Sequence, residues 1–270
     1  MAPDDGSLTV LRQIAAAEQG HLVQSHEKLL GILDLFDEEN PEWDFDAMLV
    51  RLGFSRSTLY RYLKVLTDAG LLSSFPGRGY SLGPRIIQMD YQIIVSDPLI
   101  RAARPIMQDL TQEYPSVSLL CRRYRQGVLC VHQESSTDQV RSNFERGRSR
   151  PLLRGAASQV ILAHLSPYQL SRLYDENPVA FAKAGLGETL PAVRSVLKDI
   201  RQRGWHHTVA AVTPGVTGVA TALFDAQEEV TGSLSLTFPG TDLSEEEIAG
   251  IGKRLSDASR SVAERLHKAL

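Results

Sequence analysis

The spacing of apolar residues divides the chain into two parts of different character. Up to about residue 84, apolar residues recur three and four positions apart in short stretches, which predicts short helices, and a glycine-bounded pair of strands follows. Beyond about residue 99, longer helical patterns flank alternating stretches such as 117–134 and 217–239. Strands grouped between helices are typical of an α+β domain. The pattern therefore predicts an α+β protein with two folded parts.

The first part is predicted to be a winged helix-turn-helix. A helix is expected over Phe45–Leu52, Gly53 allows a sharp turn, and Ser55 can cap the next helix through a backbone N–H. The inward face of that next helix would carry Leu59, Leu63 and Leu66. Residues 71–74 and 80–82 then predict two strands around a Pro-Gly-Arg-Gly turn, which would form the wing.

Positive charge in this part is confined to one element. Every charged residue between Ala47 and Thr67 is Arg or Lys, whereas the flanking segments are acidic. A helix of this kind is suited to lie against phosphate, and its first turns would meet base edges in a major groove. We therefore expect binding to double-stranded DNA, and the alternative is a winged helix that only mediates protein contacts. The predicted DNA-binding residues are Ser55, Arg56, Ser57, Thr58, Tyr60, Arg61 and Lys64, with Arg78 at the wing tip.

Global composition does not reveal this function. A formal net charge of -3 and a pI near 6.2 give no general attraction to nucleic acid. The chain has two cysteines, Cys121 and Cys130, which are too few for a disulfide framework and fit a reducing compartment. The N-terminus has acidic residues where a signal peptide needs positive ones, and no apolar stretch approaches the ~20 residues of a membrane span. We expect a cytoplasmic protein that does not associate with a membrane.

Several segments of the remaining chain set its predicted organisation. A helix after Gly83 is expected to break near Asp97-Pro98, and the box Ser244–Glu247 opens a last amphipathic helix. We assign no function to residues 1–24. The predicted domains are an N-terminal extension at 1–24, the winged helix-turn-helix at 25–84, a linker helix at 85–98 and a second domain at 99–270.

The chain resembles the IclR family of bacterial transcriptional regulators along nearly all of its length after residue 24. The resembling segments, in order, are LGFSRSTLYRYLKVLTDAGLL, YSLGPRI, PLLRGAASQVILAHL, LKDIRQRGW, GVTGVATALFD and GSLSLTFP. The resemblance implies an N-terminal winged helix, a linker helix and a C-terminal GAF-like domain that binds a small organic effector. It also implies homodimers, often paired into tetramers, on palindromic promoter DNA.

The resemblance further implies where the effector would bind. Family relatives place ligand contacts at a loop after the dipeptide Gly204-Trp205, at the start of the helix near Gly155, and on the last strand. On this chain the implied effector residues are Gly155, Ala156, Ala157, Thr208, Gly218, Ser235 and Thr237. Acidic residues usual in that loop are missing here, and Gly218 stands where relatives often have Cys. A roomier, less polar pocket follows, which favours an aromatic or amide-bearing effector over a very small keto acid.

Other candidate chemistries have weaker support in the sequence. Cys130, His132 and Glu134 alternate along one predicted strand, and this alternation would bring zinc-ligand types onto one face, but nothing marks a fourth ligand. A cysteine nucleophile would need a positioned base and an oxyanion hole, and neither is visible. Arginines at 141, 146, 148, 150 and 154 could bind an anion, although such a run is more often a solvated loop. We expect no metal, no cofactor and no catalytic residues.

Three function classes therefore remain. The first is a ligand-responsive DNA-binding regulator, a repressor, whose effector changes operator affinity through the linker helix. The second is an enzyme with a fused DNA-binding module, and the third is a constitutive DNA-binding architectural protein without effector. The segregated charge and the ordered family segments favour the first, so we expect a regulator and not an enzyme.

Overall fold

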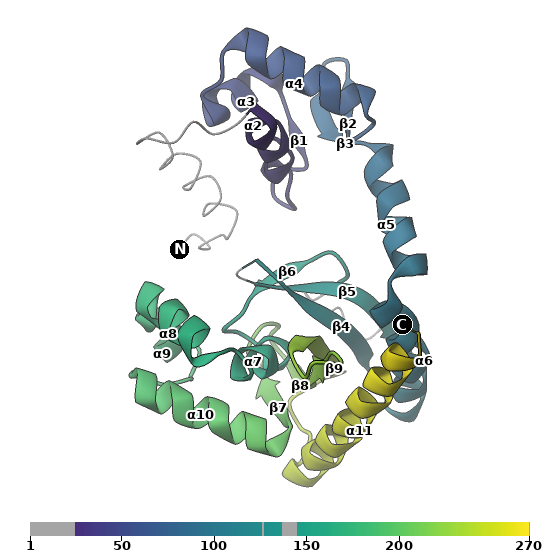
Figure 1. Ribbon diagram of the computed structural model, residues 1–270, viewed down its shortest axis with the longest axis vertical. Helices are drawn as coiled ribbons and strands as arrows, with labels where there is room; N and C mark the ends of the chain where they lie inside the picture. The colour runs from purple at the N-terminus through teal and green to yellow at the C-terminus, as the bar shows by residue number, and fades with distance from the viewer. Residues whose placement is uncertain (1–24, 126, 137–144, 270) are drawn as a thin grey trace. The chain divides into compact units, whose positions relative to one another are not determined.

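The computed structural model describes residues 25–125, 127–136 and 145–269. The predicted extension at 1–24 and Arg141 lie outside the described residues. The chain splits between Val95 and Ser96 into two compact units, so the division falls inside the segment predicted as a linker. Figure 1 shows the helices and strands of both units.

The first unit is a small helical bundle with a three-stranded sheet. Its elements are α2 (Ser25–Gly31), the 3-10 turn η2 (Leu33–Leu35), β1 (Glu42–Trp43), α3 (Phe45–Leu52), α4 (Arg56–Asp68), β2 (Leu72–Phe75), β3 (Gly79–Leu82) and α5 (Pro84–Ser96). α3 has the predicted bounds, and Gly53 ends it in the left-handed conformation. The side chain of Ser55 caps α4 by accepting a hydrogen bond from Thr58 N–H, as predicted.

The core of this unit forms where α4 packs against the preceding helices. Leu59, Leu63 and Leu66 are buried as expected. Tyr62 is also buried, and its ring meets Phe54 edge-on at 5.9 Å between centroids. The three leucines lie three and four residues apart, so burying this stripe leaves the opposite face of α4 in solvent.

One strand of this unit was not predicted. Residues Glu42 and Trp43, in the acidic segment after the first helix, form β1 and pair with β3, Trp43 opposite Tyr80. The Trp43 indole N–H donates to the Leu35 carbonyl at 2.9 Å, which ties this segment to η2. A two-residue strand is too short to show alternation, so the pattern could not predict it.

The second unit is built on one antiparallel six-stranded sheet in the order β6-β5-β4-β9-β8-β7. Its strands are β4 (Val117–Tyr124), β5 (Gly127–Ser135), β6 (Ser149–Pro151), β7 (Trp205–Val209), β8 (Val216–Phe224) and β9 (Val230–Pro239). Its helices are α6 (Pro98–Glu113), α7 (Ala156–Ala163), α8 (Pro167–Glu176), α9 (Pro178–Lys183), α10 (Leu190–Arg203) and α11 (Glu245–Ala269). This mixed architecture confirms the predicted α+β class.

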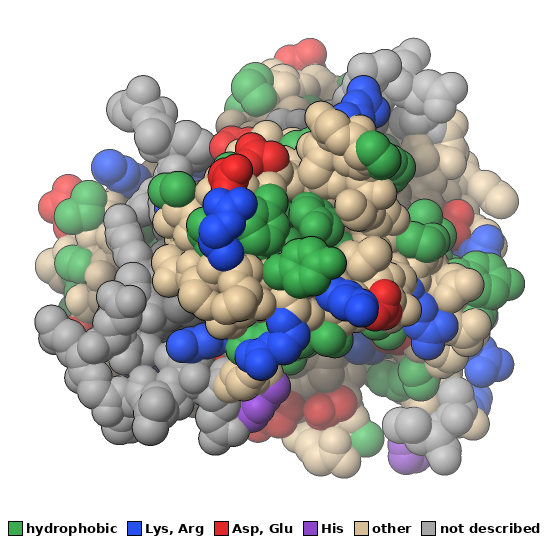
Figure 2. Space-filling view, turned by 90° about the horizontal axis from the view of Figure 1, so that it is seen from above, with side chains coloured by type: hydrophobic (Ala, Val, Ile, Leu, Met, Phe, Trp, Pro, Cys, Tyr) green, Lys and Arg blue, Asp and Glu red, His purple; other side chains and the backbone are tan. Residues whose placement is uncertain are grey.

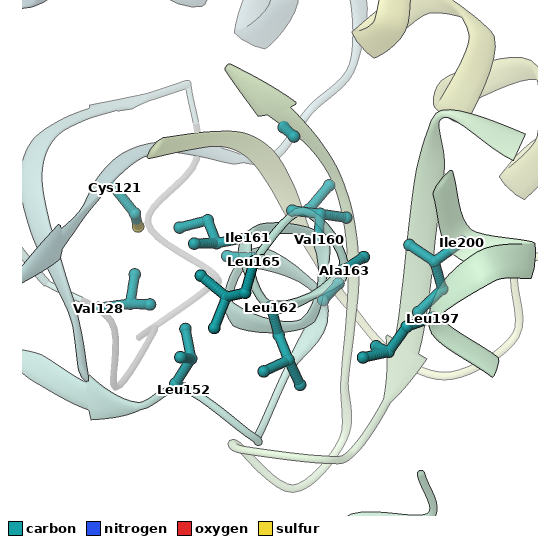
Figure 3. Packing of buried hydrophobic residues seen from close by; sticks show 14 of the residues in the cluster. Cys121, Val128, Leu152, Val160, Ile161, Leu162, Ala163, Leu165, Leu197 and Ile200 are labelled. Atoms are coloured by element: carbon teal, nitrogen blue, oxygen red, sulfur yellow. The ribbon is translucent and has the colours of Figure 1, made fainter. Parts of the chain in front are cut away.

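Helices cover both faces of this sheet, so there are two cores. α7 and α10 pack on one face, where Val160, Ile161 and Leu197 are buried (Figure 3). α6 and α11 pack on the other face, around Leu120, Leu234 and Leu236. Alternate residues of one strand therefore enter different environments, and we call the two sides the α7 face and the α6 face.

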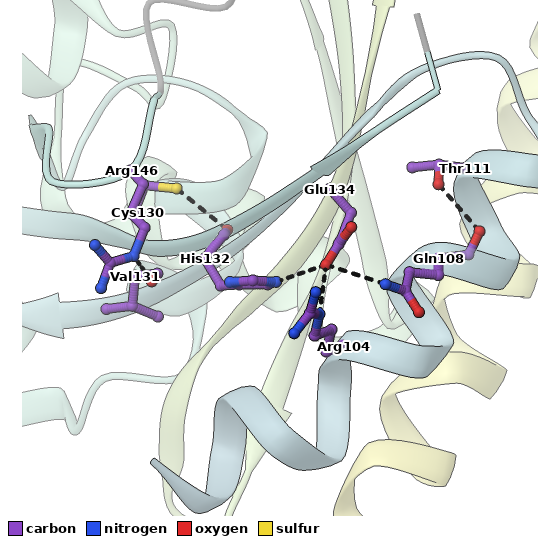
Figure 4. A network of polar contacts seen from close by, with 8 residues as sticks. All are labelled: Arg104, Gln108, Thr111, Cys130, Val131, His132, Glu134 and Arg146. Atoms are coloured by element: carbon purple, nitrogen blue, oxygen red, sulfur yellow. Dashed lines mark hydrogen bonds and ion pairs between the residues drawn. The ribbon is translucent and has the colours of Figure 1, made fainter. Parts of the chain in front are cut away.

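The expected grouping of Cys130, His132 and Glu134 on one face of a strand is wrong. Leu120 of β4 pairs with His132 of β5, but the next residue, Cys121, pairs with Cys130, so the register shifts at this point. Because paired residues point to the same side of a sheet, the shift turns Cys130 to the α7 face and leaves His132 and Glu134 on the α6 face. Figure 4 shows the cysteine pointing away from the histidine ring. The sulfur is thus separated from the other two groups.

The fit of α11 on the sheet predicts the effect of one substitution. At Gly252, an added Cβ would overlap the ring of Trp205, whereas at Gly250 it would meet no heavy atom within 4 Å. We expect Gly252→Ala to lower the free energy of unfolding by about 1–3 kcal/mol, the usual cost of overpacking. Gly250→Ala, the matched control, should stabilise the helix by up to about 1 kcal/mol. Urea unfolding followed by circular dichroism measures both; equal shifts for the two variants would contradict this packing.

Candidate functional site

The outer face of α4 carries the residues predicted to bind DNA. Arg56, Ser57, Tyr60, Arg61 and Lys64 are exposed, as are Ser55 and Arg78, while Thr58 is half-buried. Seen from above, Lys and Arg side chains lie among polar and hydrophobic ones across the centre of the view (Figure 2). The structure therefore leaves these residues accessible on one unit, and their role in DNA binding stays a prediction.

The Ser55 hydroxyl takes part in a local hydrogen-bond network at the start of α4. Its hydroxyl accepts from Thr58 N–H at 3.3 Å and donates to Thr58 Oγ1 at 2.9 Å. Ser57 Oγ lies 3.2 Å from the same hydroxyl. These contacts fix the first turn of the helix, so the side chains that follow leave it in a defined direction.

Arg56 is held by a carboxylate that the sequence analysis did not connect with it. Its Nη1 donates to Asp46 Oδ1 at 2.8 Å, and its guanidinium carbon lies 5.0 Å from the centre of the Phe45 ring. Both partners come from the first turn of α3. They lie ten and eleven residues earlier in the chain, and no helical or strand periodicity relates such positions.

Two more of the predicted cations are placed by the fold. The Arg61 guanidinium lies over the Tyr62 ring at 5.4 Å from its centre. Arg78 lies in the wing turn, where its N–H donates to the Phe75 carbonyl at 3.1 Å. Gly77, the residue before it, has φ of 76°, a conformation that glycine adopts without strain. The turn thus presents Arg78 at the tip of the wing.

A pocket in the second unit gathers all seven residues implied for the effector. The pocket, a hollow of about 50 Å³ that is partly open to solvent, lies between the start of α7, the β7–β8 segment and β9. Its lining residues are Leu119, Gly155, Ala156, Ala157, Thr208, Ala211, Val212, Thr213, Val216, Gly218, Ser235 and Thr237. None of these lining residues is ionisable. The structure brings the predicted residues together, and their role as effector ligands stays a prediction.

The polar groups of this pocket are few and mostly buried. Ser235 is only 3% exposed, and its hydroxyl has no hydrogen-bond partner among the described residues. Thr237, two residues on along β9, is 8% exposed on the same face. Thr208 Oγ1 accepts from Ala156 N–H at 3.1 Å, which links β7 to the start of α7. A buried hydroxyl without a partner is costly, so Ser235 is suited to bind a polar group of a ligand.

A second set of contacts fixes the wall of the pocket. Gln159 on α7 donates from its amide nitrogen to the Leu153 carbonyl at 2.9 Å, so its oxygen is left to accept from His206 Nε2 at 2.7 Å. The Arg154 guanidinium donates to the Ala211 carbonyl at 2.7 Å. These bonds join the start of α7 to β7 and to the loop after it.

His206, which is not among the residues that line the pocket, stays neutral over a wide pH range. Burial, with the nearby positive charge of His207 and Arg203, lowers the pKa of His206 to about 4. Nε2 is the donor toward Gln159, and Nδ1 is then unprotonated and buried without a hydrogen-bond partner among the described residues.

Five lining residues were not named from the sequence. Leu119 shares the α7 face with Ser235, its register partner, and strand alternation could have revealed it. Ala211, Val212 and Thr213 belong to the segment between β7 and β8, which has no periodicity, and Val216 is the first residue of β8. Only the folded loop shows which of its side chains reach the pocket.

The remaining candidate chemistry is engaged in structural contacts. Glu134 accepts from Arg104 at 3.0 Å and lies 2.9 Å from His132 Nε2, in a network between β5 and α6 (Figure 4). A hydrogen bond with the Cys130 thiol, and then burial, raise the pKa of the Cys121 thiol well above its ordinary value. Within the described ranges, no three His, Cys, Asp or Glu residues gather as a metal site.

The arginine-rich segment is tied to the fold at several points. Arg146 donates to the Val131 carbonyl at 2.8 Å, and Arg148 lies 4.0 Å from Glu145. Arg154 is bound to Ala211, as described above. These contacts hold the segment against β5 and the pocket wall, so it is more than the solvated loop that was expected.

Together these features define a class of protein. One unit carries a capped helix with exposed cations and a wing, and the other carries a pocket lined by small and hydroxyl-bearing residues. This combination is that of a regulator that binds DNA and responds to a ligand. In the part of the chain that the structure describes, no helix is long and apolar enough to span a membrane.

Comparison with known proteins places the chain in a family. The family described as "Bacterial transcriptional regulator IclR C-terminal" matches residues 91–264, and the "IclR helix-turn-helix domain" matches residues 25–74. The chain belongs to the IclR family of bacterial transcriptional regulators, which are ligand-responsive DNA-binding proteins, as the sequence predicted. It is therefore a transcriptional regulator of the IclR type.

Individual relatives are distant but match over nearly their whole length. The HTH-type transcriptional regulator XynR of Escherichia coli (strain K12) is 25% identical over 248 residues, covering 91% of this chain and 98% of that protein. KdgR of the same organism is 24% identical over 247 residues, covering 91% and 94%. An IclR homolog from Microbacterium hydrocarbonoxydans, crystallised with 4-hydroxybenzoate, superposes with a TM-score of 0.75 at 18% identity, covering 91% and 100%. This last likeness shows a shared fold.

The neutral His206 predicts a pH dependence of stability. Between pH 4 and about 6.5 the unfolded chain protonates this histidine while the folded chain does not, so stability is lost as the pH falls through that window. We expect the melting temperature to fall over this range, and His206→Gln, which keeps a donor for Gln159, to reduce the fall. His164, whose pKa is also lowered by burial, keeps its own part of the slope in the variant. Parallel melting curves for the two proteins from pH 4.5 to 8 would contradict the assignment.

Proposed function

We propose that this protein is a repressor that binds a palindromic promoter operator through α4 and the wing and releases it when a small organic effector occupies the pocket. The observation that carries the proposal is the buried hydroxyl of Ser235, which has no hydrogen-bond partner in the described ranges and lies in a pocket whose lining side chains are uncharged. Two relatives support repression, because they are named Transcriptional repressor IclR of Escherichia coli and Acetate operon repressor of Salmonella typhimurium. Such a protein acts in the cytoplasm, where bacterial promoters are.

The DNA-binding residues of the proposal are those on the outer face of α4 and the wing. Arg56, Ser57, Thr58 and Tyr60 occupy the first turns, where side chains meet base edges, and Arg61 and Lys64 follow within reach of phosphate. Ser55 contacts phosphate while it caps the helix, and Arg78 contacts the backbone or minor groove. The core stripe of α4 faces the opposite way, which keeps this face available.

The proposed effector is an aromatic or amide-bearing compound with a polar group at each end. Gly155 gives no side-chain cap to α7, so the N-terminus of this eight-residue helix can attract a carboxylate. The hydroxyls of Ser235 and Thr237 would bind a second polar group, and Gly218 leaves room between them. The Microbacterium relative, crystallised with an aromatic acid, supports this class.

We further propose that α5 pairs two copies of the chain. No residue of α5 is buried, yet its surface is largely apolar, with Ile87 73% and Tyr91 60% exposed. Ile87, Tyr91 and Ile94 recur four and three residues apart, which is the spacing of one helix face. A second copy would cover that face and supply the second half of a palindrome-binding dimer, alone or within a tetramer.

The coupling between the sites is proposed to run through the chain segment α5–α6. Asp97, between these helices, caps α6 by accepting from Leu99 and Ile100 N–H and also accepts from Arg122 on β4 at 3.0 Å. An effector that shifts the sheet would therefore act on the start of α6. A coupling of about 1–3 kcal/mol changes operator affinity about 5- to 150-fold.

The first experiment measures operator binding with and without effectors. Fluorescence anisotropy with DNA from upstream of the protein's own gene is recorded alone and with a panel of aromatic acids and amides. We expect salt-sensitive, sequence-specific binding that one compound weakens. Specific binding that ignores every compound would favour a constitutive DNA-binding protein, and turnover of a bound compound would favour an enzyme with a fused DNA-binding module.

Two variants should separate the two activities. Arg61→Ala is expected to weaken operator binding and leave effector binding intact, because its side chain lies on the first unit. Thr237→Val is expected to weaken effector binding, by about 1 kcal/mol for one lost hydrogen bond, and to leave basal DNA binding intact. Anisotropy and calorimetry measure the two affinities. If each variant loses both activities equally, the two-site proposal fails.

The size of the pocket is tested at Gly218. A Cβ at this position would meet only Thr208 Oγ1, at 3.9 Å, so a small side chain fits the fold and fills the pocket instead. We expect Gly218→Val to keep the melting temperature and to weaken the bulkiest effectors most. Equal affinities of the variant and the original protein across ligand sizes would place the effector elsewhere.

The role of α5 is tested by its association state. Ile87→Glu puts a charge on the exposed apolar face and should shift the protein toward monomers, with a matching loss of palindrome binding. Leu30→Glu, a change at another exposed apolar residue of the first unit, is the control. Sedimentation velocity measures both, and an unchanged oligomer in Ile87→Glu would exclude this face as the interface.

A further inference from the structure

We propose that Asp46 is a positioning residue for base recognition: it holds the Arg56 guanidinium in the orientation in which that group reads a guanine. This inference rests on the proposed role of Arg56 in operator binding. Asp46 lies outside α4, in the acidic segment that precedes the basic helix.

The geometry of the pair is set by two helix starts. Asp46 lies in the first turn of α3 and Arg56 in the first turn of α4, and the distance from Asp46 Oδ1 to Arg56 Nη1 is 2.8 Å. Each turn is fixed by a capping side chain, Asp44 accepting from Ala47 N–H at 2.8 Å and Ser55 accepting from Thr58 N–H. The ion pair therefore joins two backbone segments that are themselves held.

A second contact, with Phe45, further restricts the guanidinium. The Phe45 ring lies 5.0 Å from the guanidinium carbon, which is within the range of a cation–π contact. Asp46 engages one nitrogen of the group, while its carbon lies over the Phe45 ring. Two contacts of different direction leave the arginine fewer orientations than one would.

The arrangement leaves free the donors that guanine recognition needs. Bidentate recognition of guanine O6 and N7 takes two parallel N–H groups of one guanidinium edge. Arg56 Nη1 donates to Asp46, and Arg56 Nε and Nη2 have no hydrogen-bond partner among the described residues. The edge formed by Nε and Nη2 is thus free for a base while the carboxylate keeps its hydrogen bond.

Both side chains are well exposed, Arg56 at 69% and Asp46 at 73%, so the pair contributes little to folding. We expect the ion pair to contribute mainly to the complex with DNA. A long arginine loses rotamer freedom when it binds a base, and one that is already held loses less. A carboxylate in the first turn of α3 also favours the positive end of that helix, but close to DNA it would repel phosphate.

The test compares base preferences of variants of the full chain. Duplexes are selected from a randomised DNA library with the original protein, Arg56→Ala, Asp46→Asn and the double variant, and affinities for selected and unrelated duplexes are then measured. Arg56→Ala should lose guanine preference at one position of each half-site, with about a 5- to 150-fold drop in the ratio of specific to non-specific affinity. Asp46→Asn should weaken the guanine preference at the same position, with about a two- to fivefold drop in the ratio of specific to non-specific affinity.

Asp68→Asn is the matched control. Asp68 is exposed at the far end of α4, and its substitution changes the net charge by the same amount as Asp46→Asn. Simple electrostatics predicts that both substitutions raise non-specific affinity, and only Asp46→Asn should lower discrimination. In the double variant, Asp46→Asn should have no further effect on discrimination, because its partner is gone.

Each other outcome overturns the inference. If Asp46→Asn tightens specific binding as Asp68→Asn does, the carboxylate competes with DNA and positions nothing. If it relaxes a position different from that of Arg56→Ala, or acts equally in the double variant, it works through another residue. If Arg56→Ala leaves every preference unchanged, Arg56 reads no base. Failure of the original protein to select any sequence would instead reject the proposed operator binding.

Discussion

The second unit depends on the close pairing of β9 with β4 at the centre of its sheet. Gly232 makes this approach possible, since a Cβ there would overlap the backbone carbonyl of Cys121. With β9 in place, its alternation sends Leu234 and Leu236 into the core under α6 and α11. The same alternation sends Ser235 to the α7 face, where it lines the pocket. One strand therefore supplies both the apolar core and the polar wall of a site.

In the first unit, a few buried apolar residues on one side of α4 leave the opposite face of the helix exposed. Leu59, Leu63 and Leu66 bury one stripe of α4, so its cations are presented to solvent, and Arg61 lies over the ring of its neighbour Tyr62. Arg56 differs because its contacts, Asp46 and Phe45, come from another helix, α3. In the proposed operator complex, preorganisation of Arg56 sharpens recognition, while the other cations of α4 attract phosphate without regard to sequence.

Local signals in the sequence were reliable where a single element decides the outcome. The bounds of α3 and the cap at Ser55 follow from spacing and capping chemistry, and the structure has both. The family segments also named pocket residues on β9, on β7 and at the start of α7. Contacts between elements were not predictable: β1 needs β3 to exist, and the loop residues of the pocket, such as Val212, needed the folded chain.

The sequence by itself therefore determined the order of elements, the α+β class, the charge on α4 and the family. Each of these depends on residues near one another in the chain. Only the tertiary structure decided which distant side chains meet. The register shift between β4 and β5 separates Cys130 from His132, although their spacing placed them together. Asp46 reaches Arg56 because two helix starts converge, and such convergence depends on packing across the whole unit, which local periodicity does not encode.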